Sequence, residues 1–184
     1  DGGATMIQLR DKAAGPRQLL PDARRIAQLC RERGVRFIVN DRLDLALAAD
    51  ADGVHLGQDD LPPAAARAIL GSDKLLGVST HSFEQALEAA EQGADYLGIG
   101  PIFATGTKAT GYEPRGCDII RQLRARIDLP LIAIGGIALN NVAEVIQAGA
   151  TGAAVISAIV GAADITAATA AFVTAIPHAA QPRL

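Results

Sequence analysis

Short apolar runs alternate with longer amphipathic stretches along the whole chain. The runs have the length and aliphatic composition of strands that are buried on both faces of a parallel sheet. Several follow a glycine or alanine turn, as in GGATMIQL, ADGVHLGQ, GADYLGIG and GATGAAVI, and glycine commonly ends a preceding helix. The pattern predicts strands over Met6–Arg10, Arg36–Asn40, Gly53–Leu56, Leu75–Thr80, Tyr96–Gly100, Leu131–Gly135 and Ala153–Ser157.

The stretches between these runs repeat apolar residues every three or four positions. This spacing places the apolar side chains on one face of a helix, where they can pack on a sheet. The pattern predicts helices over Leu19–Cys30, Asp44–Ala49, Pro63–Leu70, Phe83–Gln92, Cys117–Arg126, Asn140–Ala148 and Ile165–Ile176.

Strands that alternate regularly with helices indicate an α/β fold with a parallel sheet. An open doubly wound sheet is one solution, but the near-equal spacing favours a closed TIM (βα)₈ barrel. The pattern supplies one strand too few for this barrel. The opening DGGAT is typical of a helix–strand turn, so we expect the first strand and helix to lie upstream. Residues 1–184 would then form a single domain holding strands and helices 2–8 of the barrel.

Composition narrows the classes of partner. Hydrophobic residues make up 49% of the 184 residues and charged residues 20%, as in globular domains, and no apolar run is long enough for a membrane span. The formal net charge of −3 argues against nucleic-acid binding. The two cysteines, Cys30 and Cys117, lie far apart and are expected to be free thiols in a cytoplasmic protein. The sequence leaves a homo-oligomer and a fused upstream domain open.

Polar residues gather where the predicted strands end, which is where βα barrels build their active sites. Gln8, Arg10 and Lys12 would share one face of the first strand, because successive side chains alternate. The other strand ends carry Asn40-Asp41, HLGQDD with Asp60, Ser79-Thr-His81, Gly135-Gly136 and Ile156-Ser157. Helix capping explains one such residue in each loop, and His55 and His81 are more typical of hydrogen-bonded structural residues.

These side chains fall into three chemical groups. Arg10, Lys12 and Lys108 provide positive charge for a diphosphate. Asp41 and Asp60 on adjacent loops suit Mg²⁺, which favours one or two carboxylates together with substrate phosphates. Loops after the last two barrel strands often bind a phosphate through backbone amides, which assigns that role to Gly136, Ile156 and Ser157. Two phosphate sites and one metal predict a transfer reaction with pyrophosphate as the leaving group.

The chain also resembles a known family through seven motifs in order. They are QLRDK, VNDRLDLAL, ADGVHLGQDDLP, GVSTHS, GADYLGIGPIFATGTK, AIGGI and AVISAI, and together they resemble thiamine-phosphate synthase from Asp1 to about residue 160. The resemblance implies a cytoplasmic, Mg²⁺-dependent transferase of thiamine biosynthesis. Its reaction couples 4-amino-2-methyl-5-hydroxymethylpyrimidine diphosphate with hydroxyethylthiazole phosphate, giving thiamine phosphate and pyrophosphate.

The same resemblance implies a role for each matching residue. Asp41 and Asp60 would hold Mg²⁺, and Lys108, Arg10 and Ser79 would take part in catalysis. The pyrimidine diphosphate would be bound by Gln8, Leu9, Arg10, Asp11, Lys12, Asn40, Ser79 and Lys108, and the thiazole phosphate by Thr105, Gly106, Thr107, Gly136, Ile156 and Ser157. The segment ATGYEPRG departs from the motif, and no role follows for Tyr112 or Arg115.

Two other functions compete with this interpretation. A related thiazole tautomerase would share the thiazole-phosphate corner and would need a proton shuttle, for which His81 is the candidate. A tautomerase, however, has no use for the charged set Arg10, Lys12, Asp41, Asp60 and Lys108. A non-catalytic barrel that binds a phosphorylated ligand is the second alternative, and the completeness of that charged set argues against it.

Overall fold

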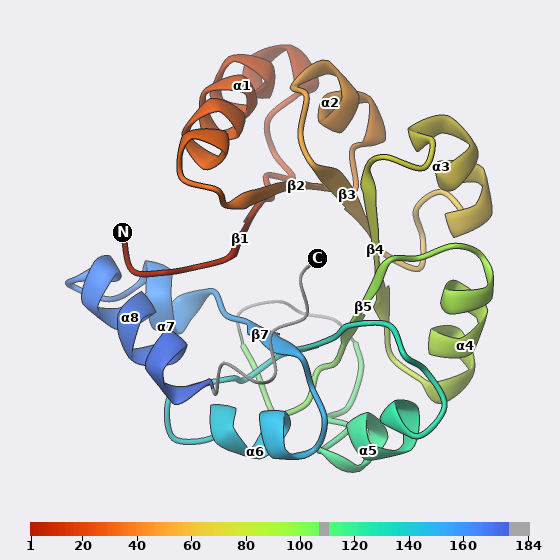
Figure 1. The fold of residues 1–184 in the computed structure, drawn as a ribbon, viewed down its shortest axis with the longest axis vertical. Coiled ribbons are helices and arrows are strands. Elements are labelled where there is room, and N and C mark those ends of the chain that lie inside the picture. The colour runs from red at the N-terminus through yellow and green to blue at the C-terminus, as the bar shows by residue number, and fades with distance from the viewer. Residues whose placement is uncertain (107–110, 177–184) are drawn as a thin grey trace. The chain divides into compact units, whose positions relative to one another are not determined.

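The computed structural model describes residues 1–106 and 111–176 (Figure 1). Two predicted site residues, Thr107 and Lys108, lie outside these ranges. The chain divides into two compact units. The N-terminal unit comprises Thr5–Val78 and Gln92–Asp95, and the C-terminal unit comprises Asp1–Ala4, Ser79–Glu91 and the chain from Tyr96 onward.

The N-terminal unit alternates strands with helices, and its strands are parallel neighbours in chain order. The side chains of β3 are all buried and those of β2 are buried at its centre, as expected for strands covered on both faces. Its elements are β1 (Met6–Leu9), α1 (Pro16–Glu32), β2 (Arg36–Asn40), α2 (Leu43–Ala48), β3 (Gly53–Leu56), α3 (Pro63–Leu70) and the first four residues of β4 (Leu75–Thr80).

The C-terminal unit continues the same alternation. Its strand β5 is buried throughout and pairs in parallel with β6, which pairs in parallel with β7. Its elements are α4 (Phe83–Glu91), β5 (Tyr96–Ile99), α5 (Asp118–Arg124), β6 (Leu131–Ile134), α6 (Val142–Gln147), β7 (Gly152–Ala154), α7 (Ser157–Val160) and α8 (Ile165–Ala175).

The repeated turn seen in the sequence performs the same task in both units. Its first residue has a positive φ, which glycine and aspartate tolerate better than most residues. The third residue has a polar side chain that accepts a hydrogen bond from a backbone amide of β2, β4 or β6. The first residues are Asp50, Gly93 and Gly149, with φ values of 52°, 92° and 109°. Among the third residues, Asp52 accepts from the Phe37 amide at 2.8 Å, Asp95 from Leu76 at 2.7 Å, and Thr151 from Leu131 at 2.8 Å.

Arginine side chains donate to main-chain carbonyls at or just beyond the ends of helices. Arg24 on α1 donates to the carbonyl of Ala48, the last residue of α2, at 3.2 Å. Arg67 on α3 donates to the Gly93 carbonyl and Arg124 on α5 to the Gly149 carbonyl, which follows α6. The last carbonyls of a helix have no partner within the helix, so the Arg24 side chain satisfies a group that would otherwise rely on water. Cys30 and Cys117 are free thiols, as predicted.

The structure confirms the α/β class and the parallel strands, and corrects the end of the pattern. The last strand was predicted over Ala153–Ser157, but β7 spans Gly152–Ala154 and Ser157 begins the short helix α7, which the pattern missed. Only Gly152, Ala153 and Ala154 pair with β6, and Ile156 is 50% exposed rather than packed in a sheet. Within the described ranges, no helix combines the length and apolar character needed to cross a bilayer.

Candidate functional site

An acidic pair lies where two neighbouring strands of the N-terminal unit end. Asp41 directly follows β2, has φ 61°, and its amide donates to the His55 carbonyl at 2.8 Å. Asp60 lies in the loop after β3, where its carboxylate accepts from the Gly57 amide at 2.7 Å. A non-glycine residue with left-handed backbone is uncommon and is concentrated at functional sites. The backbone therefore presents both carboxylates at the same edge of the sheet.

The electrostatics of Asp41 show which charges surround it. Partial burial raises the pKa of the Asp41 carboxyl, and the carboxyl of Asp60, within hydrogen-bonding reach, raises this pKa further. The positive charges of Lys12 and Arg10 act in the opposite direction and lower it. Four of the five charged residues predicted to form one cluster thus lie together in this unit. The fifth, Lys108, lies outside the described residues.

This pair suits a magnesium ion better than a metal that needs a complete protein cage. Among residues 1–106 and 111–176, no group of three or more histidine, cysteine or acidic side chains could hold a metal. Zinc sites usually need three or four such ligands, whereas Mg²⁺ is held by one or two carboxylates, with water and phosphate oxygens completing the octahedron. The raised pKa of Asp41 supports this fit, because a cation would relieve the repulsion between the two carboxylates.

The segment after β1 supplies the cations of this cluster. β1 ends at Leu9, so the strand alternation predicted to align Gln8, Arg10 and Lys12 stops before Lys12, and all three are exposed. Asp11 accepts from the amides of Ala13 and Ala14 at 2.7 and 3.0 Å, and these two bonds lower its pKa. Its carboxylate is therefore used to shape the turn that carries Lys12. Asn40 is half-buried as the last residue of β2.

The C-terminal unit has a corner built from backbone. Gly135 and Gly136 follow β6 with φ values of 91° and 65°. A Cβ at Gly136 would lie 2.5 Å from the Ala104 carbonyl oxygen and 2.8 Å from Cβ of Phe103, so only glycine lets the loops after β5 and β6 approach this closely. The approach is fixed by amide hydrogen bonds from Ile102 to Ile134 and from Phe103 to Gly135, at 2.9 and 3.1 Å.

The other predicted residues of this unit lie at the ends of strands or beyond them. Thr105 is half-buried and Gly106 exposed in the loop after β5, and Ser79 is half-buried near the end of β4. Ile156 precedes α7 and Ser157 is its first residue, so their amides belong to a first turn, where amides lack acceptors within the helix. Thr107, assigned to the same phosphate, lies outside the described residues.

Two features of this corner were not predicted from the sequence. Asn141 donates to the Gly136 carbonyl at 2.9 Å and accepts from the Ala138 amide at 2.8 Å, which fixes the glycine loop. The asparagine pair Asn140-Asn141 directly before α6 was the sequence feature that could have indicated this role. The second feature is a stack between the rings of His81 and Tyr112, whose centroids are 3.8 Å apart with an interplanar angle of 17°.

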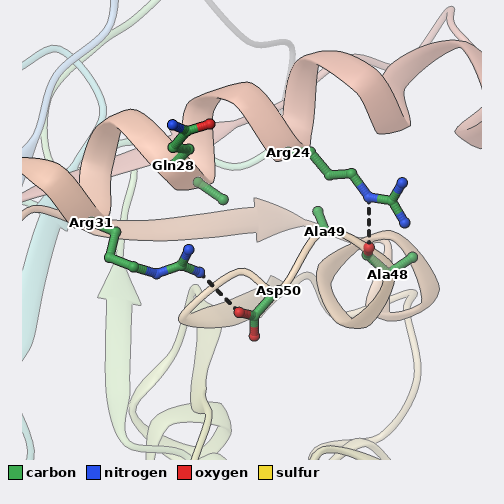
Figure 2. Close-up of a pocket in the computed structure, with 7 residues that line it drawn as sticks. Arg24, Gln28, Arg31, Ala48, Ala49 and Asp50 are labelled. Atoms are coloured by element: carbon green, nitrogen blue, oxygen red, sulfur yellow. Dashed lines mark hydrogen bonds and ion pairs between the residues drawn. The ribbon is translucent and has the colours of Figure 1, made fainter.

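A shallow surface pocket of the N-terminal unit lies away from these groups. Figure 2 shows it between α1 and the end of α2, with Arg24 and Arg31 reaching toward Ala48 and Asp50. The Arg31–Asp50 ion pair spans 2.8 Å, but both side chains are mostly exposed, so it contributes little to stability. Asp50 precedes β3, which places this pocket near the amino-terminal ends of the strands, away from Asp41 and Asp60.

Comparisons with known proteins identify the family of this chain. A family model described as thiamine monophosphate synthase matches residues 1–159. A thiamine-phosphate synthase from Chloroflexus aurantiacus is 54% identical over 91% of this chain and 77% of that protein, and one from Shouchella clausii is 50% identical over 98% and 86%. The solved structure of thiamine phosphate pyrophosphorylase from Pyrococcus furiosus aligns with a TM-score of 0.89 and 42% identity over 95% of this chain and 84% of that one. The chain belongs to the thiamine monophosphate synthase family.

Proposed function

We propose that this chain is a thiamine-phosphate synthase. It would couple hydroxymethylpyrimidine diphosphate with hydroxyethylthiazole phosphate to give thiamine phosphate and pyrophosphate. The observation that carries the proposal is the cluster of Arg10, Lys12, Asp41 and Asp60, in which two cations adjoin two carboxylates, and burial together with Asp60 raises the pKa of Asp41. The proposed reaction rests on the similarity to relatives named thiamine-phosphate synthase.

The N-terminal unit would bind the diphosphate. Arg10 and Lys12 are exposed, and an arginine can donate hydrogen bonds to two phosphate oxygens at once. Asp41 and Asp60 would hold Mg²⁺, which supplies charge stabilisation to the departing pyrophosphate when it is bound. Gln8, Leu9, Asp11 and Asn40 adjoin these residues in the sequence. Ser79 and Lys108 are the other two residues that the family resemblance assigns to the diphosphate.

The C-terminal unit would bind the thiazole phosphate with neutral donors. Gly136 and the first amides of α7 at Ile156 and Ser157 would donate to phosphate oxygens, together with Thr105, Gly106 and Thr107. The Asn141 side chain donates to the carbonyl of Gly136 and not to its amide. A monophosphate monoester needs fewer cations than a metal-bound diphosphate, which matches the uncharged character of this set.

The chemistry requires one bond to break and one to form. The C–O bond between the pyrimidine methylene and the diphosphate breaks, and its electron pair leaves with pyrophosphate. The thiazole nitrogen then donates its lone pair to the methylene carbon. Arg10, Lys12 and Lys108 would stabilise the charge on the leaving group, the effect that usually supplies most of an enzyme's rate. The neutral nitrogen needs no base, so the protein need not supply one.

The family accounts for several further expectations, which form part of the proposal. Residues 1–184 would form one βα-barrel domain. The substrates would be small phosphorylated molecules, and the proposal includes a cytoplasmic location, a homo-oligomer and no nucleic-acid partner.

The direct test is the release of pyrophosphate from the two purified substrates. A synthase releases pyrophosphate only when both substrates and Mg²⁺ are present, and forms one thiamine phosphate for each pyrophosphate. A tautomerase or a binding protein releases none under any combination. Release from the pyrimidine diphosphate alone, at the same rate with and without the thiazole, would contradict the proposal, because it would indicate hydrolysis.

A further inference from the structure

The rings of His81 and Tyr112 stack on each other and so join the end of β4 to the loop after β5 in the C-terminal unit. His81 immediately follows β4, and Tyr112 lies in the long loop between β5 and α5. Their centroid separation of 3.8 Å and angle of 17° describe a face-to-face contact over most of each ring. Tyr112 remains 39% exposed, so apolar burial alone does not explain why this ring is fixed.

The imidazole is itself held in one orientation. Its Nδ1 contacts the Gly100 carbonyl, and a carbonyl only accepts hydrogen bonds, so Nδ1 carries a proton. The His81 amide donates to the Gln85 side chain at 2.8 Å, and the neighbouring Thr80 hydroxyl donates to Gly98 at 3.2 Å. The ring against which Tyr112 stacks is thus fixed by the ends of β4 and β5.

Tyr112 also belongs to a segment that runs back along the start of its own loop. The Arg115 amide donates to Pro101 at 2.8 Å and the Gly116 amide to Ile102 at 3.0 Å. The starting segment also contacts the glycine corner. The Phe103 amide donates to the Gly135 carbonyl, and Phe103 and Ala104 pack closely against Gly136. A continuous set of contacts therefore leads from His81, through Tyr112 and residues 101–103, to Gly135 and Gly136.

We propose that His81 and Tyr112 are positioning residues for the thiazole phosphate. Their stack fixes the returning segment of the loop after β5, which bonds to Pro101 and Ile102 and would through them position Thr105 and Gly106 beside the glycine corner. Neither ring needs to touch the substrate. The inference rests on the proposed function, in which this corner binds the thiazole phosphate and the N-terminal unit binds the diphosphate.

The role predicts a selective kinetic effect. Tyr112→Ala should raise KM for hydroxyethylthiazole phosphate about 3- to 10-fold, the range that the loss of one aromatic pair allows, with KM for the pyrimidine diphosphate unchanged within about 2-fold. Tyr112→Phe should restore the wild-type value, because the ring is kept. Glu113→Ala, an exposed neighbour in the same segment, serves as the matched control.

A double-mutant cycle tests whether the two rings act together. His81→Ala should raise the same KM, and the variant carrying both His81→Ala and Tyr112→Ala should resemble either single variant. Multiplication of the two effects in the double variant would overturn the proposal. Equal KM changes for both substrates would overturn it as well, and so would a failure of Tyr112→Phe to restore the wild-type value.

A spectroscopic measurement separates this inference from the proposed activity. The chain has three histidines, and comparison with His81→Gln assigns the imidazole signal of His81 in a proton NMR spectrum. A ring stacked on tyrosine is shifted by the ring current, so Tyr112→Ala should move this signal and Tyr112→Phe should not. An unmoved signal in Tyr112→Ala would contradict the stack. If the stack is present but the wild-type protein releases no pyrophosphate, the proposed function fails while the structural contact stands.

Discussion

The two units use the same strand–helix alternation but place different chemistry at the ends of their strands. In the N-terminal unit, charged side chains converge, with Asp41 and Asp60 beside Arg10 and Lys12. In the C-terminal unit, backbone dominates, with Gly135 and Gly136 packed against Ala104 and Phe103. The same architecture therefore builds one candidate site from charged side chains and the other from closely packed backbone.

The difference has consequences for mutation. A charged site loses function when a charge is removed, even if every atom stays in place. A backbone site loses function when a methyl group is added, even if no charge changes. Substrate binding in the N-terminal unit should therefore depend on pH and magnesium, whereas binding in the C-terminal unit should depend mainly on side-chain size at the glycines.

The largest effect is expected from the loss of a proposed metal ligand, Asp60, or of the lysine proposed to stabilise the pyrophosphate, Lys108. Asp60→Ala and Lys108→Ala should each lower kcat at least about 100-fold, because electrostatic stabilisation of this size is usual for such groups. Steady-state release of pyrophosphate measures the loss. Asp60→Asn keeps an oxygen for the Gly57 amide and controls for folding. Turnover near the wild-type rate in both alanine variants would refute the metal and pyrophosphate assignment.

Asp41→Asn should separate function from stability. Burial and Asp60 raise the pKa of Asp41, so the ionised carboxylate destabilises the folded state, and the stability of the protonated form is lost as pH rises through this raised pKa. Without Mg²⁺ at pH 7.5, the variant should gain roughly 1–3 °C in Tm, a small value because the group is partly solvated. The gain should vanish near pH 4, and activity should be lost at every pH.

In the wild-type protein, the same raised pKa should appear in the metal affinity. Protons compete with Mg²⁺ for Asp41, so the apparent Kd for Mg²⁺ should begin to rise at a higher pH than an ordinary aspartate would allow. Below this pKa, the Kd should rise about 10-fold for each pH unit. Calorimetric titration from pH 8 down to the ordinary pKa of an aspartate, about 4, measures it, and a Kd independent of pH over this whole range would argue against Asp41 as a ligand.

Gly136→Ala should damage the C-terminal corner without changing any charge. The new methyl group would meet the Ala104 carbonyl oxygen at 2.5 Å, at a φ of 65°. We expect KM for the thiazole phosphate to rise about 10-fold and stability to fall by roughly 1–3 kcal/mol. Gly34→Ala has nearly the same φ, 66°, but nothing within 4 Å, so it isolates backbone strain from the clash. Equal effects of the two substitutions would contradict the packing argument.

The smallest effect is expected at a turn that only holds strands together. Thr151→Val removes the acceptor of the Leu131 amide at 2.8 Å and should cost about 1–2 kcal/mol of unfolding free energy. Urea denaturation measures this loss. Neither KM should change, and a substrate-specific change would mean that this end of the sheet is coupled to the site.

Much of this comparison could be predicted from residue patterns. The apolar runs located β2, β3 and β4 at their observed bounds, because buried parallel strands leave a continuous aliphatic signature. The charged cluster could be predicted as well, since Asp41 and Asp60 follow adjacent strands. The prediction failed at β7, where Val155 and Ile156 extended the apolar run although only Gly152–Ala154 pair with β6. A strand of small residues such as Gly152–Ala154 cannot be located from hydrophobicity alone.

Contacts between loops could not be predicted in this way. The His81–Tyr112 stack and the bonds of Asn141 join residues that are separated in sequence or follow no periodicity, so they depend on how the loops after β4, β5 and β6 fold. Gly136 was predicted as a phosphate-binding residue, and its close packing against Ala104 and Phe103 appears only in the structure.

The most direct test of the central claim is calorimetric binding of the pyrimidine diphosphate in the absence of the thiazole, with and without Mg²⁺. If Arg10, Lys12, Asp41 and Asp60 hold a magnesium-bound diphosphate, Mg²⁺ should tighten binding at least about 10-fold in the wild-type protein and have no effect in Asp60→Asn. The same affinity with and without Mg²⁺ in the wild-type protein, or an undiminished magnesium effect in Asp60→Asn, would contradict the account.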